Sequence, residues 1–103
     1  MDQERKERVA HNESAARELN ERFGLGTFVC ECGDLDCRDA VRMPVSVYDS
    51  IRADSRRFFV LPGHEIPEAE EVVIRREDFF VVRKRDDVGH IVDERDPRAT
   101  RRV

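Results

Sequence analysis

The chain lacks the two kinds of segment that would take it into or across a membrane. It has no continuous apolar run near the length of about 18 residues that a membrane-spanning helix needs. Its first residues, Met1-Asp-Gln-Glu-Arg-Lys, do not contain the apolar core of a secretory signal. The sequence therefore predicts a cytoplasmic protein with no membrane segment, in a compartment where thiols stay reduced.

Tryptophan is absent, tyrosine occurs once, and there is no surplus of positive charge. The 103 residues contain 19 Lys and Arg against 23 Asp and Glu, which gives a formal net charge of −4. Because nucleic-acid interfaces need basic surfaces, the composition does not support nucleic-acid binding. The basic cluster of Arg52, Arg56 and Arg57 is instead expected to pair with the acidic loop at 64–78.

Several catalytic patterns are also missing. The chain has no glycine-rich phosphate loop, no Ser-His-Asp set, and no His-x-Glu motif followed by Pro-Cys-x-x-Cys, the pattern of zinc deaminases. A zinc hydrolase would also need an open coordination position and a general base. The sequence therefore favours a protein that is not an enzyme, and a zinc-dependent hydrolase is the least favoured alternative.

The chain does contain three closely spaced cysteines, Cys30, Cys32 and Cys37, which are its only ones. Side chains two apart on an extended segment point to the same face, so the first two sulfurs can reach one ion. Gly33 then permits a sharp turn that brings the third sulfur round. Since the residues between the cysteines are mostly polar, the pattern predicts a metal site rather than buried free thiols or a disulfide framework.

A closed site needs a fourth ligand, and His64 is the best candidate. It follows Pro62-Gly63, a turn that would fix the position of its ring, and Glu65 is expected to support that ring. Three thiolates and one imidazole form a tetrahedral set that suits Zn²⁺. Oxygen ligands that suit zinc less well remain as alternatives: Asp34 and Asp36. The other histidines are expected at the surface: His11 and His90.

Residues 2–22 are predicted to form a helix, because they contain no glycine or proline and are rich in Glu, Arg and Ala. Apolar residues at helical spacing form one narrow stripe: Val9, Ala16, Leu19 and Phe23. This helix either packs on its own domain or projects as an arm that finds a partner protein, and the stripe is compatible with both.

The remaining segments predict short elements. They are predicted to be a strand at 27–31, a helix from Pro44 to Ala53, a strand at Arg57–Leu61, a hairpin of Val72–Arg76 and Phe79–Arg83, and a third strand at Gly89–Asp93. The expected fold is α+β, with an N-terminal helix, a zinc-knuckle loop, a second short helix and a small antiparallel sheet. The predicted organisation is a helical arm at 1–24, a zinc-stapled domain at 25–97 and a basic tail at 98–103.

Four stretches carry motifs in a fixed order: Phe28–Cys37, Tyr48–Ala53, Arg57–Glu65 and Asp96–Arg98. The first has the form Phe-x-Cys-Glu-Cys-x-Asp-x-x-Cys, and the third ends in Pro-Gly-His-Glu. Together they resemble an uncharacterised family of small bacterial proteins of actinobacterial type. The resemblance covers most of the chain. It implies that the three cysteines and His64 belong to one zinc-binding site, and it implies no reaction.

The sequence therefore predicts a small zinc-binding regulatory or adaptor protein that contacts a protein partner through its N-terminal helix. The alternative from a different class is a thiol-based redox switch, in which oxidation of the cysteines releases the ion. Because a Cys-x-Cys disulfide is strained, Cys37 is the better partner for either of the other two. Neither the partner nor the oligomeric state can be named from the sequence.

Overall fold

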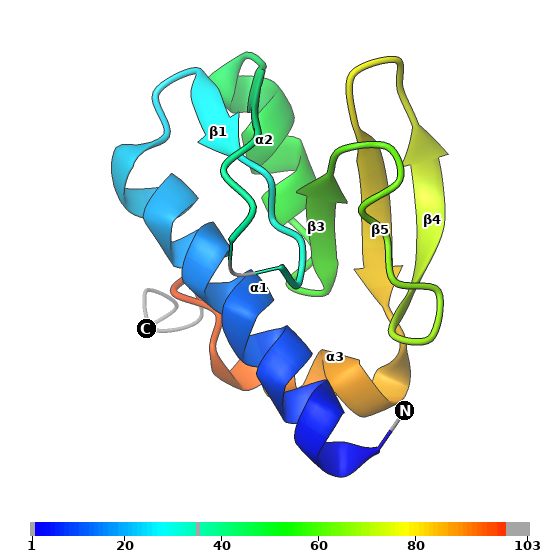
Figure 1. Cartoon of the computed structure of the whole chain (residues 1–103). Helices are drawn as coiled ribbons and strands as arrows, with labels where there is room; N and C mark the ends of the chain where they lie inside the picture. The colour runs from blue at the N-terminus through cyan, green and yellow to red at the C-terminus, as the bar shows by residue number, and fades with distance from the viewer. Residues whose placement is uncertain (1, 35, 99–103) are drawn as a thin grey trace.

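The computed structural model describes residues 2–34 and 36–98 and confirms the α+β fold. The elements are α1 (Gln3–Phe23), β1 (Thr27–Val29), β2 (Ala40–Arg42), α2 (Val45–Arg52), β3 (Arg57–Val60), β4 (Glu70–Arg75), β5 (Phe80–Lys84) and α3 (Asp86–Glu94). Helix α1 crosses the molecule diagonally beside the larger sheet, and α3 lies at one end of that sheet (Figure 1). Residues 99–103 of the predicted basic tail lie outside the described residues.

Two antiparallel sheets form the β part of the fold. In the larger sheet the order is β3-β5-β4, so the predicted hairpin is present and β3 pairs with its second strand. The smaller sheet pairs β1 with β2, with Phe28 opposite Val41. The second helix, predicted from Pro44 to Ala53, is confirmed as α2 with Pro44 at its N-cap, whereas strand β2 before it was not predicted.

Strand β3 lies between two apolar clusters, because consecutive side chains of a strand point to opposite faces. Phe58 belongs to a cluster that also contains Cys30, Cys32 and residues of α1 and α3. Phe59 belongs to a second cluster with Phe28 and Tyr48. Cys30 and Cys32 therefore pack against the apolar core.

Helix α1 lies against the body of the chain, in contact with α3 and β1. Of the predicted apolar stripe, Val9 is buried, whereas Leu19 and Phe23 are 47% and 69% exposed, so the stripe as a whole is not the buried face. The face that is buried is largely polar: Val9, Ala10, Glu13, Ser14, Arg17 and Asn20. No helix within the described residues combines the length and apolar character needed to cross a bilayer.

The charged groups and the amide among these residues are tolerated in the core because they find partners there. Arg17 donates to the backbone oxygens of Ser55 and Val92 at 2.6 and 2.8 Å. Glu13 contacts Lys84 of β5, which also contacts Glu70 of β4. Glu13, Glu70 and Lys84 are each at most 2% exposed, and we call them the Lys84 cluster.

The strand predicted at Gly89–Asp93 is wrong, because this segment belongs to helix α3. Val88 and Val92, four residues apart, are fully buried on one side of the helix. Asp86 and Asp87 lie in the first turn, where the helix dipole favours negative charge. A Cβ at Gly89 would lie 2.6 Å from Nε of Arg56, so a larger residue there would push the arginine side chain away from the helix.

The expected pairing of three arginines with the acidic loop at 64–78 is also wrong. Arg52 pairs with Glu21 and Asp96 at 3.0 and 2.5 Å. The other two pairings are Arg56 with Asp86 and Asp93, and Arg57 with Asp54. These arginines therefore connect helices and turns within the fold.

Candidate metal centre

The structure brings Cys30, Cys32, Cys37 and His64 together, with their ligand atoms all within 4.8 Å of one another. Nδ1 of His64 lies 3.5 Å from Sγ of Cys30 and 3.6 Å from Sγ of Cys37. In a tetrahedron with zinc–sulfur bonds of about 2.3 Å and zinc–nitrogen bonds of about 2.0–2.1 Å, nitrogen and sulfur lie about 3.6 Å apart. This set of residues could therefore hold a metal ion.

Backbone hydrogen bonds hold Cys30 at the end of β1 and His64 in a turn after β3. Cys30 directly follows β1, and its N–H donates to the backbone oxygen of Asp39 at 2.8 Å, which extends the pairing of β1 with the segment before β2. His64 is held by a turn in which its N–H donates to the oxygen of Leu61 at 3.0 Å. Gly63 in that turn has φ of 91°, a conformation that glycine adopts at little cost.

The three thiols differ in how readily they lose a proton, because a hydrogen bond and burial raise the pKa of Cys30, burial raises that of Cys37, and hydrogen bonds lower that of Cys32. The backbone N–H of Leu61 donates to Sγ of Cys30 at 3.3 Å. A hydrogen bond from the Cys30 thiol lowers the pKa of Cys32 to about 5, whereas the same bond and burial raise the pKa of Cys30. One thiolate is therefore already favoured near neutral pH. Since metal ligands must be deprotonated, an ion would displace the remaining thiol protons.

Glu31 lies between two ligands in the sequence but points away from them. Although it is one of the polar residues between the cysteines, its side chain is fully buried in the core. Its carboxylate accepts from the Tyr48 hydroxyl at 2.6 Å, from Nδ2 of Asn20 at 3.0 Å and from the Phe59 N–H at 3.2 Å. The Cys-Glu-Cys segment therefore serves the candidate site on one face and anchors to the core on the other.

Helix α1 supports the cysteine segment directly. The side-chain amide of Asn20 donates to the oxygen of Val29 and accepts from its N–H, both at 2.8 Å, as a neighbouring strand would do. Nδ2 of Asn12 donates to the oxygen of Gly33 at 3.1 Å. The chain bends at Gly33, as expected from the sequence, and a Cβ there would meet Ile66 at 2.9 Å, so this glycine also allows close packing.

Asp39 is a residue near the site that the sequence reasoning missed as a partner of His64. Its Oδ2 lies 3.8 Å from Nε2 of His64 and 4.0 Å from Sγ of Cys37. Glu65, which the sequence suggested for this role, instead accepts from the backbone N–H of Gly63 at 2.8 Å. Pairing of β1 with β2 brings Asp39 back to the site, and that pairing was not predicted.

The other candidate groups lie elsewhere or make local contacts. His11 is exposed on α1, next to Arg95, and His90 is exposed on α3 rather than in a loop. Oδ1 of Asp34 accepts from the backbone N–H of Asp36 at 2.9 Å. The oxygen ligands left open by the sequence therefore lie outside the cluster of four.

Two cavities adjoin the four residues. One, of about 260 Å³, lies between α1 and the cysteine segment and is lined by Cys30, Cys37 and Leu19 among others. The other, of about 230 Å³, is lined by Cys32, His64 and Ile66 among others. Small molecules in solvent can therefore approach the candidate ligands from two sides.

Comparison with protein-family models, with curated proteins and with solved structures found no match for this chain. The resemblance to a small bacterial family therefore stays a prediction from the motifs. The function has to be argued from the site and the surface themselves.

Proposed function

We propose that this chain is a small zinc-binding protein, not an enzyme, that acts as a regulatory or adaptor module by contacting another protein. The observation that supports the zinc assignment is the convergence of three sulfurs and one imidazole nitrogen within 4.8 Å of one another, with Nδ1 of His64 3.5 and 3.6 Å from the sulfurs of Cys30 and Cys37. Zinc is the ion of choice because a mononuclear set of three thiolates and one imidazole favours it.

A structural role for the ion follows from the number and origin of its ligands. Four protein ligands fill a tetrahedral site and leave no position for a substrate or a reactive water. The ion would join Cys30 to His64 across 34 positions of sequence, closing a long loop. It would thereby hold the Leu61–His64 turn against the cysteine segment and α1.

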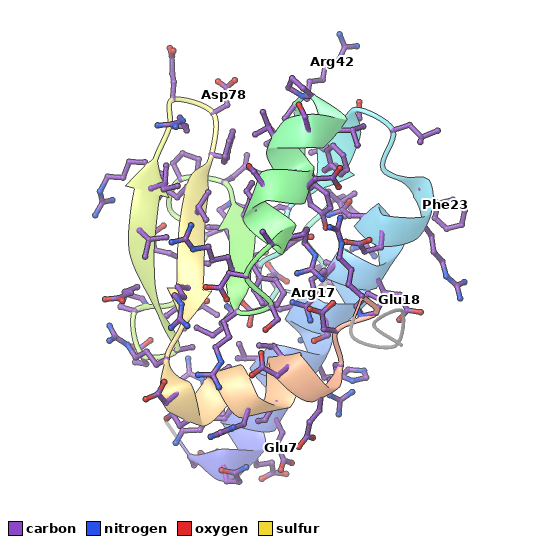
Figure 2. The ribbon with its side chains drawn as sticks, turned by 180° about the vertical axis from the view of Figure 1, so that it is seen from behind. Glu7, Arg17, Glu18, Phe23, Arg42 and Asp78 are labelled. Atoms are coloured by element: carbon purple, nitrogen blue, oxygen red, sulfur yellow. The ribbon has the colours of Figure 1, made fainter. Side chains whose placement is uncertain are left out.

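The exposed apolar end of α1 supports a role in protein contacts. Leu19 and Phe23 lie four residues apart on the helix and are 47% and 69% exposed, and Leu25 after them is 90% exposed. Phe23 lies at the outer end of α1 and points away from the larger sheet (Figure 2). Grouped exposed apolar side chains often mark interaction sites.

Native mass spectrometry of protein purified without an affinity metal tests the zinc assignment. We expect one zinc ion per chain in the wild type and weakened or absent zinc in His64→Ala. His90→Ala is the matched control, because His90 is exposed on α3 and far from the cluster in sequence. A wild type without bound zinc, or a His64→Ala variant that binds zinc as the control does, would contradict the proposal.

The partner role is tested with surface variants of the zinc-loaded protein. Deletion of residues 1–22 is unsuitable, because α1 supplies buried groups such as Val9 and Arg17. The double variant Leu19→Ser/Phe23→Ser should keep the fold and lose proteins that the wild type captures from a lysate of its source cells. If the wild type and the double variant captured the same proteins, the exposed end of α1 would not be the contact surface.

A thiol-based redox switch is a second function, favoured by the unequal exposure of the cysteines. Cys37 is partly exposed while Cys30 and Cys32 are buried, and one cavity reaches both Cys37 and Cys30. A peroxide would oxidise Cys37 to a sulfenic acid and itself be reduced, and a second cysteine would then form a disulfide with release of water and zinc. Zinc release by mild peroxide that a dithiol reverses would support the switch, whereas retention of zinc up to unfolding would exclude it.

A further inference from the structure

The two nitrogens of the His64 ring face different groups. Nδ1 points into the cluster, 3.5 and 3.6 Å from the sulfurs of Cys30 and Cys37. Nε2 lies 3.8 Å from Oδ2 of Asp39. A neutral imidazole carries one proton and one free lone pair, so the group next to each nitrogen decides which of them can ligate a metal.

Asp39 is held in this position by its own backbone. Its oxygen accepts the Cys30 N–H at 2.8 Å, and the next residue, Ala40, begins β2 and pairs with Val29. Its carboxylate therefore reaches two of the four ligands, His64 and Cys37, while its backbone contacts a third. The side chain is 61% exposed, so it fills no gap in the core.

We propose that His64 ligates the ion through Nδ1 and that Asp39 is a positioning residue that holds the proton on Nε2. This inference rests on the proposed zinc site and specifies how its fourth ligand is oriented. A carboxylate beside Nε2 stabilises the tautomer protonated there, leaves the Nδ1 lone pair free for the metal and makes the imidazole a better donor. At 3.8 Å the contact is longer than a hydrogen bond, so a direct bond requires the two groups to move closer together when the ion binds.

The affinity test compares zinc binding by wild type, Asp39→Asn and Asp36→Asn in competition with a chromophoric chelator. Asp39→Asn keeps the size and backbone of the residue and removes its charge, and we expect about 10- to 100-fold weaker zinc binding. Asp36→Asn removes a charge from an exposed side chain of the same loop and should bind zinc as the wild type does. Asp39→Glu should restore part of the loss.

The tautomer test uses long-range proton–nitrogen correlation spectra of the zinc-loaded protein. The proposal predicts that Nδ1 of His64 is the metal-bound nitrogen and Nε2 carries the proton, with faster solvent exchange of that proton in Asp39→Asn. Zinc ligation through Nε2, or equal zinc affinity of Asp39→Asn and wild type, would overturn the inference and leave the zinc site intact. A wild type that binds no zinc would overturn both, and the metal content alone distinguishes that case.

Discussion

The candidate metal centre and the Lys84 cluster both join segments that are distant in the sequence, but they are built from opposite kinds of groups. In the metal centre, three thiols and an imidazole surround a space that suits a cation. In the Lys84 cluster, the cation is a side chain of the chain itself, and both carboxylates contact it. The first would be completed by an ion taken up from solution, whereas the second is completed by folding alone.

The two regions also differ in how they respond to loss of one member. Removal of one buried charge leaves its partners unpaired in a medium of low dielectric constant. Removal of the ion leaves thiols, which can take up protons and become small apolar groups. We therefore expect the Lys84 cluster to be the more sensitive of the two to single substitution.

The largest effect is expected for Lys84→Met. This change leaves Glu13 and Glu70 buried without their cation, and we expect a loss of about 3–5 kcal/mol in the free energy of unfolding, measured by urea denaturation. The triple variant Lys84→Met/Glu13→Leu/Glu70→Leu is the control and should recover most of that loss. A single variant that costs no more than about 1 kcal/mol, as for an exposed ion pair, would contradict the comparison.

Removal of the metal is expected to have the next largest effect. A ligand present at about a thousand times its dissociation constant adds about 4 kcal/mol to the stability of the folded state. The melting temperature of the zinc-loaded protein should therefore fall on treatment with a strong chelator and return when zinc is added back. Scanning calorimetry of Cys30→Ser provides the control, and a zinc response of that variant equal to the wild type would count against the site.

A third prediction concerns the pH dependence of stability. Burial raises the pKa of Glu13 from 4.5 to about 8, although the charge of Lys84 opposes the shift. Between these pH values the folded chain keeps a proton that the unfolded chain has released, so this group makes stability fall as pH rises through the window and level off above it. In Glu13→Gln the decline should be smaller in urea titrations across the same range, and an unchanged decline would assign it to other groups.

The smallest effect is expected for Phe23→Ala. A side chain that is 69% exposed contributes little to the core, so the free energy of unfolding should change by no more than about 0.5 kcal/mol. Val9→Ala on the buried face of the same helix is the matched control and should cost more. A large loss in Phe23→Ala would show that the end of α1 packs on the chain instead of being free for a partner.

The sequence predicted the convergence of the three cysteines and His64 better than the rest, because most of this pattern is local. Three cysteines within one short segment have few uses other than metal binding. The Pro-Gly turn before His64 indicates that the position of the imidazole ring is restrained. The contact between His64 and Asp39 could not be predicted, because it depends on the pairing of β1 with β2. Burial of Glu31 could not be predicted for a similar reason, since its partners Asn20, Tyr48 and Phe59 come from three separate elements.

Helix α1 shows where hydrophobic periodicity fails. A search for apolar residues at helical spacing selected Leu19 and Phe23, whereas the buried side carries Glu13 and Arg17. Burial of these charged groups is decided by partners far along the chain, Lys84 for the carboxylate and the Val92 oxygen for the guanidinium. Helix α3 was predicted as a strand because it contains Ile91 and Val92, residues that are also common in strands.

The two-faced Cys-Glu-Cys segment makes this part of the chain intolerant of changes in length. Cys30 and Cys32 point to the candidate site while Glu31 points into the core. Insertion of a single residue beside Glu31 would reverse the faces that follow it, directing a sulfur toward Tyr48 and a carboxylate toward the ion. Over evolutionary time, substitutions and length changes are therefore expected in the exposed part of the loop before Cys37, and the spacing from Cys30 to Cys32 is expected to stay fixed.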